Sequence, residues 1–472
     1  MCKVDILTIN YSGQISGQNC FEAHNYGTFH RALNSKKCVN FCKALEWRLW
    51  GMRKRIIIVL TIIIFIGCFI NTNNSNNSSL IGAYIDGEYA SNIPSKDDGY
   101  VVEKIVCDNE ANATWDYKSW GLLLTNVKKK AKCNVYFTKD DIVNSIKANL
   151  DTTGKCPVVD DTGKTKLSGP ETENALICSI PDDYGTSYYY RGPVKNNYVY
   201  FAGYYWRIMR INGDGSIRMI YDGTMAHENS ESTEDKIIGY SAFNDKSGDN
   251  AYVGYMYGTP NSSTYEETHR NINSSTIKSY LDDWYVKNLE NKNDFIADNI
   301  FCNDRTIHGY SGSEYINTKL GYSNNSTYYR WAFAIYGDDT YNAYNYLFCT
   351  NKNDSFTVSD KIHGNGDLSY AIGLISKEEL LLAGGWGERE LENIKKLYFY
   401  TGIAYWTISP HWVGSIGNAT GDYVAMGSLS KDSDTNMSIS ILEKLGVKPV
   451  INLKPNSLKL GDGTISNAYR VS

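Results

Sequence analysis

The chain has 472 residues, with 47 Lys and Arg against 52 Asp and Glu and a formal net charge of −5. This length predicts two or three domains, since one domain usually spans about 100–200 residues. The charge excludes a strongly basic nucleic-acid-binding protein, and the 42% of hydrophobic residues exclude a generally disordered chain. The 38 Tyr and 40 Gly, against 9 Pro, predict β structure with many turns.

An uncharged segment, Ile56–Ile70, follows the basic cluster Arg53–Arg55 and has Thr61 as its only polar residue. It has no polar face, which disfavours a buried helix of a soluble domain. We interpret residues 52–70 as a membrane signal-anchor helix. A cleaved signal peptide and a lipoprotein signal that places the lipid on Cys68 are the open alternatives.

Charge predicts the orientation of this segment. Residues 1–55 carry nine Lys and Arg against three acidic residues, whereas residues 71–95 carry no Lys or Arg. The positive-inside rule therefore predicts a cytoplasmic N-terminus, a single span in contact with membrane lipid, and export of residues 71–472. Residues 1–51 are interpreted as a cytoplasmic tail or an upstream extension, with translation from Met52 as the alternative.

Six cysteines follow the apolar segment, and an even number of cysteines in an exported chain predicts disulfide bonds. Pairing between sequence neighbours is the simplest connectivity, and six free buried thiols are the alternative. The predicted bridges are Cys107–Cys133, Cys156–Cys178 and Cys302–Cys349. No Cys-x-x-Cys pair or His cluster follows residue 70, so the sequence predicts no metal site and no cofactor.

The exported part is predicted to contain a linker, two domains and a connector. Residues 71–80 are polar and form the linker, and the alternating residues 81–137 are typical of a small antiparallel β domain with a disulfide. Residues 138–187 are predicted to hold a short helix, begun by the capping-box-like segment Thr138–Asp141, followed by loop. Residues 188–472 form a large β-rich domain with a few helices, so the predicted fold class is α+β.

Within the large domain, the clearest local prediction is a hairpin. Strands Tyr204–Ile211 and Ile217–Tyr221 flank a short turn that is rich in Gly and Asn. The spacing of Asn212, Asp214 and Ser216 is similar to that of a calcium loop. The Gly and Glu that such a loop requires are missing, so a hairpin turn is the preferred interpretation.

Two helices and several late strands are also predicted. A helix over Ser274–Asn291 has one apolar face, and Ser376–Glu379 forms a capping box before a second helix. After residue 397 the alternation predicts short strands in the segments LYFYTG, YWTISP, DYVAMGSL and VKPVINLK.

The C-terminal half resembles an uncharacterised domain common in surface proteins of gut Gram-positive bacteria. The matching stretches are YYYRGPVKNNYVYFAGYYWRIMRINGDGSIRMIYDGT, VGYMYGT, FCNDR, GLISKEELLLAGG, YWTISP and GVKPVINLKPNSLKLGDGT. The small domain resembles the partner often found upstream of it, through AYIDGEYASNIPSKDDGY, WDYKSW and KCNVYF. Together the stretches cover roughly residues 81–472. The resemblance implies fold and location and no established activity.

The large domain of that family distantly resembles the formylglycine-generating-enzyme and C-type-lectin-like fold. There, a W-x-x-SP strand precedes a terminal G-[FV]-R segment, whereas Lys448 stands here where Arg is usual. This difference weakens any anion-binding role at the position, because Lys lacks the planar guanidinium fork. Formylglycine-generating enzymes rely on late cysteines, and none follows Cys349. Their catalytic apparatus is therefore not carried over.

The sequence predicts no catalytic residue. No nucleophile elbow, zincin motif, P-loop or dinucleotide fingerprint is present, and the exported His residues stand alone. The leading hypothesis is a non-catalytic surface protein that binds a glycan, a cell-wall component or a host surface. The alternatives are an extracellular or cell-wall enzyme with an unrecognised carboxylate site, and a purely structural surface protein.

The ligand-binding candidates are aromatic residues in Gly-rich segments that are predicted to be loops. Their rings could stack on sugar rings, and neighbouring Asp or Asn could bind hydroxyls. Ordinary core packing is the alternative for each Trp. The candidates, in the loops Trp331–Asp339, Gly384–Glu388 and Ser409–Asp422 and in the preceding strand, are Trp331, Trp386, Trp406, Trp412 and Asp422.

Overall fold

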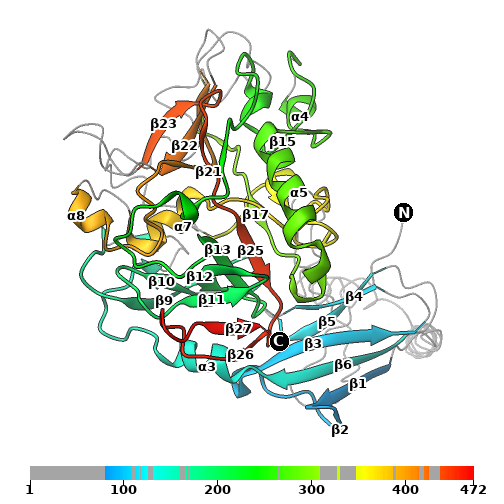
Figure 1. Ribbon diagram of the computed structural model, residues 1–472. Coiled ribbons are helices and arrows are strands. Elements are labelled where there is room, and N and C mark those ends of the chain that lie inside the picture. The colour runs from blue at the N-terminus through cyan, green and yellow to red at the C-terminus, as the bar shows by residue number, and fades with distance from the viewer. Residues whose placement is uncertain are drawn as a thin grey trace, which may run out of the picture. The chain divides into compact units, whose positions relative to one another are not determined.

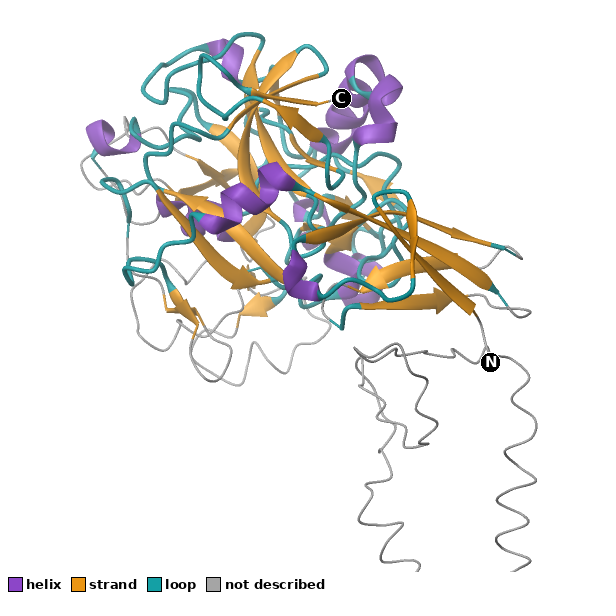
Figure 2. Cartoon of the chain, turned by 90° about the horizontal axis from the view of Figure 1, so that it is seen from below, coloured by secondary structure: helices purple, strands orange, loops and turns teal. Residues whose placement is uncertain are grey.

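The computed structural model describes residues 80–471. It leaves out 109–111, 117–118, 126–130, 160–164, 167–169, 263–264, 309–326, 330–346, 386–389, 414–418 and 425–435. The chain is a β-rich α+β protein with few helices (Figure 2). It divides into two compact units, each described here by itself. The smaller unit includes residues 80–95, 104–115 and 121–136, and the larger unit includes most of the chain beyond.

The sheet of the smaller unit has the strand order β2-β1-β6-β3 (Figure 1). Its strands are β1 (Leu80–Ile85), β2 (Glu88–Ala90), β3 (Tyr100–Cys107) and β6 (Lys132–Lys139), with a separate pair β4 (Asn112–Asp116) and β5 (Gly121–Thr125). Alternation directs Ala83, Cys133 and Val135 to the buried side, where Leu122 and Leu124 of β5 are also buried. The predicted strand pattern of this region is confirmed.

All three predicted disulfides are confirmed. The Cα atoms of Cys107 and Cys133 lie 4.0 Å apart, and those of the other two pairs lie 5.6 Å apart. The loops that they close span 26, 22 and 47 residues. Each bridge therefore reduces the conformational entropy of the unfolded chain mainly within the loop that it closes.

The larger unit contains two principal sheets. The first has the order β25-β13-β12-β11-β27-β26, with β10 pairing to β12 and β9. Its strands are β9 (Leu176–Pro181), β10 (Thr186–Arg191), β11 (Tyr198–Phe201), β12 (Tyr204–Ile211), β13 (Ile217–Gly223), β25 (Val450–Leu453), β26 (Leu458–Leu460) and β27 (Tyr469–Val471). The β12–β13 hairpin confirms the clearest local prediction.

The second sheet has the order β14-β24-β21-β19-β18, with β22 pairing to β21 and β23. Its strands are β14 (Tyr240–Ser241), β18 (Ile307–His308), β19 (Thr327–Tyr329), β21 (Tyr405–Val413), β22 (Ala419–Val424), β23 (Asn436–Ser440) and β24 (Leu445–Gly446). Three short pairs complete the strands: β7 (Val158–Val159) with β8 (Thr165–Lys166), β15 (Met256–Tyr257) with β16 (Asn273–Ser274), and β17 (Phe301–Cys302) with β20 (Ser355–Phe356).

Helices are short, apart from α5, and most begin at a capping side chain. They are α3 (Asp141–Ala148), α4 (Tyr265–Thr268), α5 (Thr276–Asn288), α7 (Lys377–Leu380) and α8 (Leu391–Ile394). A π-helical turn at Leu381–Gly385 follows α7, and 3₁₀ turns lie at Lys96–Asp98, Glu234–Lys236, Asn250–Val253, Glu290–Phe295 and Lys352–Asp354. Both predicted later helices are present, and the capping box at Ser376 and Glu379 is confirmed.

One continuous hydrophobic core joins the sheets of the larger unit. Ile208 of the first sheet and Ile408 of the second both have 0% exposure. Helix α5 adds Ile277, Leu281 and Tyr285 to this core, which is the apolar face that the sequence predicted.

Three local predictions differ from the structure. Residues 176–181, expected in a connecting loop, form β9 of the first sheet. Helix α3 is capped by Asp140, whose carboxylate accepts the Val143 N–H at 3.0 Å, and not by Thr138. The segment LYFYTG forms turns after α8, with Tyr398 and Phe399 buried. A short apolar run is compatible with either a strand or a buried turn. Here the run forms turns whose aromatic side chains are buried.

In the part of the chain that the structure describes, no helix is long and apolar enough to cross a membrane. The predicted membrane segment, with its ends at Ile56 and Ile70, lies outside these residues, as do the linker residues 71–79 and residues 1–51.

Candidate functional site

Three tyrosines from different strands form a row across the outer face of the smaller unit's sheet. Tyr84 and Tyr89 are direct partners in β1 and β2, with ring centroids 5.7 Å apart. Tyr136 in β6 stacks on Tyr84 with a centroid distance of 4.7 Å and an interplanar angle of 18°. Lys104 in β3 places Nζ 4.8 Å from the Tyr136 ring centroid. These four residues, the tyrosine row, follow the strand order of the sheet.

The strand pleat explains why these side chains share one face. Ala83, Cys133 and Val135 point to the buried side, so the residues next to them in sequence point outward. Two residues before Tyr84 and Tyr136 on the same strands, Gly82 leaves space for the Asn134 side chain. A Cβ on Gly82 would lie 2.6 Å from the Asn134 amide oxygen. The row is therefore bordered by an amide group that can bond a hydroxyl.

The ring of Tyr89 is the most solvent-exposed ring of the row. The Tyr136 ring lies under the Lys104 ammonium group and stacks on the Tyr84 ring. Contacts within the row therefore hold the Tyr136 ring in place. Tyr89 is 71% exposed. Its partly negative ring face can pack against the C–H groups of a sugar ring, and a phenol hydroxyl can donate and accept hydrogen bonds.

The structure contradicts the ligand-binding prediction for Trp406. Its side chain has 0% exposure, and its indole N–H donates to the Ser241 carbonyl at 2.9 Å. Its ring lies edge-on to Phe243, with centroids 5.8 Å apart. Both conditions for a core tryptophan are met, because the apolar body is buried and the polar N–H is bonded.

The remaining predicted site residues are not brought together by the structure. Trp412 is half-buried in β21, opposite Thr420 of β22, and Asp422 lies in β22 opposite Ser438 of β23. The described parts of the segment Ser409–Asp422 are thus paired strands, and the prediction of a loop there is wrong. Trp331 and Trp386 lie outside the described residues.

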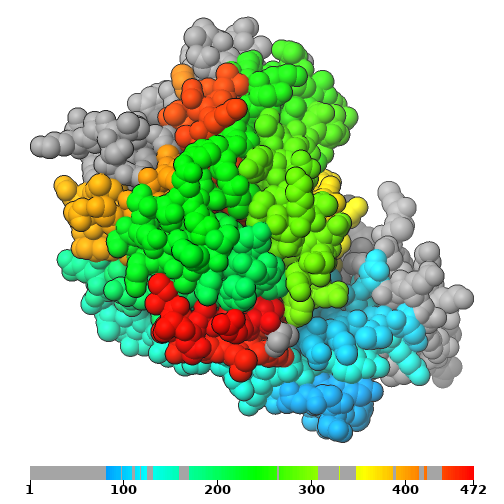
Figure 3. Space-filling model, viewed as in Figure 1, coloured from blue at the N-terminus to red at the C-terminus, as the bar shows by residue number. Residues whose placement is uncertain are grey.

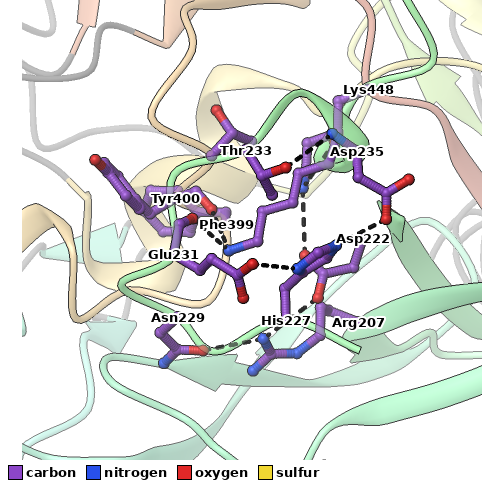
Figure 4. A network of polar contacts seen from close by, with 12 residues as sticks. Arg207, Asp222, His227, Asn229, Glu231, Thr233, Asp235, Phe399, Tyr400 and Lys448 are labelled. Carbon is purple, nitrogen blue, oxygen red and sulfur yellow. Dashed lines mark hydrogen bonds and ion pairs between the residues drawn. The ribbon is translucent and has the colours of Figure 1, made fainter. Parts of the chain in front are cut away.

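A buried charge network lies in the larger unit (Figure 4). The Asp222 carboxylate lies 3.7 Å from Arg207 Nη1 and 3.6 Å from Lys448 Nζ, and all three side chains have 0% exposure. Arg207 also donates to the side-chain oxygens of Asn197, at 2.7 Å, and Asn229, at 2.9 Å. Because the Lys448 side chain is fully buried, it is not accessible to a ligand from solvent. The role of the network is therefore to stabilise the fold of the larger unit.

The loop before the 3₁₀ turn Glu234–Lys236 is attached to the same region. The His227 ring faces Glu231 through Nδ1 at 3.0 Å and Asp235 through Nε2 at 2.7 Å. Lys236 Nζ donates to the carbonyls of Glu228 and Glu231 at 2.8 and 2.9 Å. These contacts hold residues 228–231 against the 3₁₀ turn.

Lys448 makes the stability of the protein depend on pH. Burial, with the neighbouring cations Lys236 and Arg207, lowers the pKa of Lys448 to about 7, although Asp222 opposes this shift. Between pH 7 and the unfolded pKa near 10.5, the unfolded chain holds a proton that the folded chain lacks. The free energy of unfolding should therefore rise from pH 7 to pH 9.

Urea unfolding of the wild type and of Lys448→Met at the two pH values measures this effect. The free energy of unfolding of the variant should rise less, because the titrating amine is gone. The ion pair between Asp222 and Arg207 is kept in the variant. Equal rises in the two proteins would contradict the assignment to Lys448.

A small polar cavity of about 30 Å³ lies among charged side chains of the larger unit, including Asp183 and Glu378. Burial raises the pKa of Asp183 to about 6, and its carboxylate accepts the Cys349 N–H at 3.0 Å. Glu379 lies between Arg210, at 3.3 Å, and Arg218. Since one water needs about 10–15 Å³, the cavity has room for water and is too small for a sugar residue.

A groove of about 550 Å³ lies elsewhere on the larger unit, within the size range of small-molecule sites. Its lining is almost entirely polar and charged, including Lys195, Glu228, Asn229, Glu392 and Lys396. Such sites are usually lined by apolar and aromatic side chains, whereas the lining of this groove includes no aromatic residue and Pro193 as its one apolar residue. The tyrosine row is therefore the stronger candidate site.

Sequence reasoning missed the tyrosine row because it assigned binding to Trp. The signal was the excess of 38 Tyr over 10 Trp, together with Tyr84, Tyr89 and Tyr136 in segments predicted to be strands. In the ranges that the structure describes, no group of three or more His, Cys, Asp or Glu residues is placed to hold a metal ion.

Comparison of this chain with protein-family models, with curated proteins and with solved structures gives no match.

Proposed function

We propose that this chain is a membrane-tethered, extracytoplasmic surface protein whose role is the non-catalytic binding of a glycan. The tyrosine row is the observation on which the proposal rests. It offers an exposed ring, fixed phenol groups and a cation on one face of a sheet. An aromatic group held in place loses little conformational entropy on binding, which favours affinity per contact.

Location forms the second part of the proposal. Three disulfides favour an oxidising compartment outside the cytoplasm. The apolar segment 56–70, with the basic residues before it, would anchor the chain and leave residues 71–472 exported. The sequence resembles surface proteins of gut Gram-positive bacteria, whose large domain is C-type-lectin-like. We include this resemblance in the proposal because it agrees with a location outside the cytoplasm.

Replacing Tyr89 with alanine should weaken glycan binding at least ten-fold, which corresponds to about 1.4 kcal/mol for a central aromatic contact. Full-length protein in detergent, applied to an array of plant, cell-wall and host glycans, identifies the ligand. Titration of that ligand then measures the affinity of each variant. Tyr89→Phe should bind nearly as well as the wild type, because it keeps the ring.

The free energy of unfolding serves as the control. Since Tyr89 is 71% exposed, Tyr89→Ala should change it by no more than about 0.5 kcal/mol. Unchanged binding by Tyr89→Ala would refute the assignment of the site to the tyrosine row.

A further inference from the structure

The pattern Tyr-x-x-Gly-x-Tyr occurs twice in the chain, once in each unit. The first copy, residues 84–89, reads Tyr-Ile-Asp-Gly-Glu-Tyr and joins β1 to β2. The second copy, residues 200–205, reads Tyr-Phe-Ala-Gly-Tyr-Tyr and joins β11 to β12. The repeated pattern places the same residue types at the same distance from a hairpin turn.

The two hairpin turns have similar φ angles at their central residues. In the first, φ is 50° at Asp86 and 89° at Gly87, and in the second it is 54° at Ala202 and 87° at Gly203. Positive φ at both central residues is typical of a two-residue type I′ turn, and Gly reaches this region without strain. Alanine has no such freedom, so the second turn keeps its shape against a local conformational cost.

The tyrosines lie at equivalent positions in both hairpins. Tyr200 is the direct partner of Tyr205, one step from the turn, as Tyr84 is of Tyr89. The ring centroids are 5.1 Å apart in the second hairpin and 5.7 Å apart in the first. The second hairpin therefore presents the same aromatic pair as the first.

The second pair belongs to the outward side of its sheet. Val199 and Trp206, next to Tyr200 and Tyr205 in sequence, have 0% exposure, whereas the two tyrosines are partly exposed. Beyond Tyr200 the sheet continues into β27 and β26, where Arg470 is exposed and Leu460 is 65% exposed. The red C-terminal segment that contains these strands lies at the surface in Figure 3. Burial in the core does not explain the pair.

Each aromatic pair has a cation beside it. The Arg470 guanidinium carbon lies 5.2 Å from the centroid of Tyr200, and Lys104 lies over Tyr136, next to Tyr84. Neither cation has an ion pair with any carboxylate among the residues that the structure describes. A ring beside an unpaired cation complements a sugar that carries a negative group, because the ring packs on the sugar while the cation binds the anion.

We propose that Tyr200 and Tyr205, with Arg470, form a second glycan platform, and that both hairpins bind an acidic polysaccharide. The proposal rests on the proposed function for the first hairpin, whereas the second hairpin is a separate site with its own residues.

The test uses the full-length protein in detergent and three polysaccharides: polygalacturonate, which carries carboxylates, phosphomannan, which carries phosphates on its sugar rings, and neutral dextran. The two acidic polymers distinguish the possible sources of the negative group. The variants are Tyr84→Ala with Tyr89→Ala, Tyr200→Ala with Tyr205→Ala, and all four changes together. Matched Tyr→Phe pairs keep the rings, and Arg470→Gln removes the second cation.

Each alanine pair should weaken binding to at least one acidic polymer ten-fold or more, and the four changes should abolish it. The phenylalanine pairs should bind nearly as the wild type does. Arg470→Gln should reduce the salt dependence of binding, since fewer counterions exchange. Loss of binding by the second pair alone would retain the second platform, but it would contradict both the proposed function and the assignment of the polymer to the first hairpin.

The inference is overturned if Tyr200→Ala with Tyr205→Ala binds as the wild type does, or if dextran binds as tightly as the acidic polymers. Failure of the wild type to bind either acidic polymer overturns it as well. Urea unfolding separates binding from folding. If the phenylalanine pair also loses binding while its unfolding midpoint stays unchanged, packing of rings on the sugar is excluded.

Discussion

Replacing Asp222 with alanine should lower the free energy of unfolding at pH 7 by about 3–5 kcal/mol, the usual cost of removing one partner from a buried ion pair. Asp222 is the carboxylate that faces both Arg207 and Lys448, and all three side chains have 0% exposure. Its removal leaves the Arg207 guanidinium without a compensating charge and the Lys448 amine without its carboxylate partner, both fully buried. Denaturant unfolding of the oxidised protein measures the loss.

The double variant Asp222→Ala with Lys448→Met is the matched control. It removes the unpaired amine along with the carboxylate, so its loss of stability should be smaller than the sum of the two single losses. Glu392→Ala, at an exposed residue of α8, should leave the unfolding midpoint unchanged. A loss below about 1 kcal/mol for Asp222→Ala would mean that the carboxylate is not the centre of this network.

Replacing Trp406 with alanine should lower the free energy of unfolding by about 3–5 kcal/mol, because it leaves a large cavity in the core of the second sheet. The indole is fully buried, bonds the Ser241 carbonyl and packs against Phe243. Trp406→Phe keeps most of the packing and should cost less, mainly through the unpaired carbonyl. Chemical denaturation monitored by far-ultraviolet circular dichroism gives both values.

Trp412→Ala, on the same strand, is the comparison for Trp406. Trp412 is half-buried, so its replacement should cost less than that of Trp406. If Trp406→Ala instead kept its stability and lost glycan binding, the assignment of Trp406 to the core would be wrong and the original prediction of a ligand contact would stand.

Local signals were sufficient for much of the fold. The Gly- and Asn-rich turn predicted the β12–β13 hairpin, and Ser376 with Glu379 predicted the start of α7, because turns and caps depend on residues a few positions apart. The disulfide partners were predictable because each pair joins sequence neighbours. The prediction failed where an apolar run, such as residues 397–402, was compatible with both a strand and a buried turn.

The sequence by itself thus determined the β-rich class, the disulfide pairing and the main hairpin. Only the tertiary structure decided which aromatic residues are accessible. Tyr84 meets Tyr136 because β1 and β6 are neighbours in the sheet, and Trp406 is enclosed because residues from distant segments cover it. The same holds for Asp222 and Lys448, which lie far apart in sequence. Strand neighbours and burial depend on how the whole chain packs, and the residue type of a single aromatic or charged side chain does not encode them.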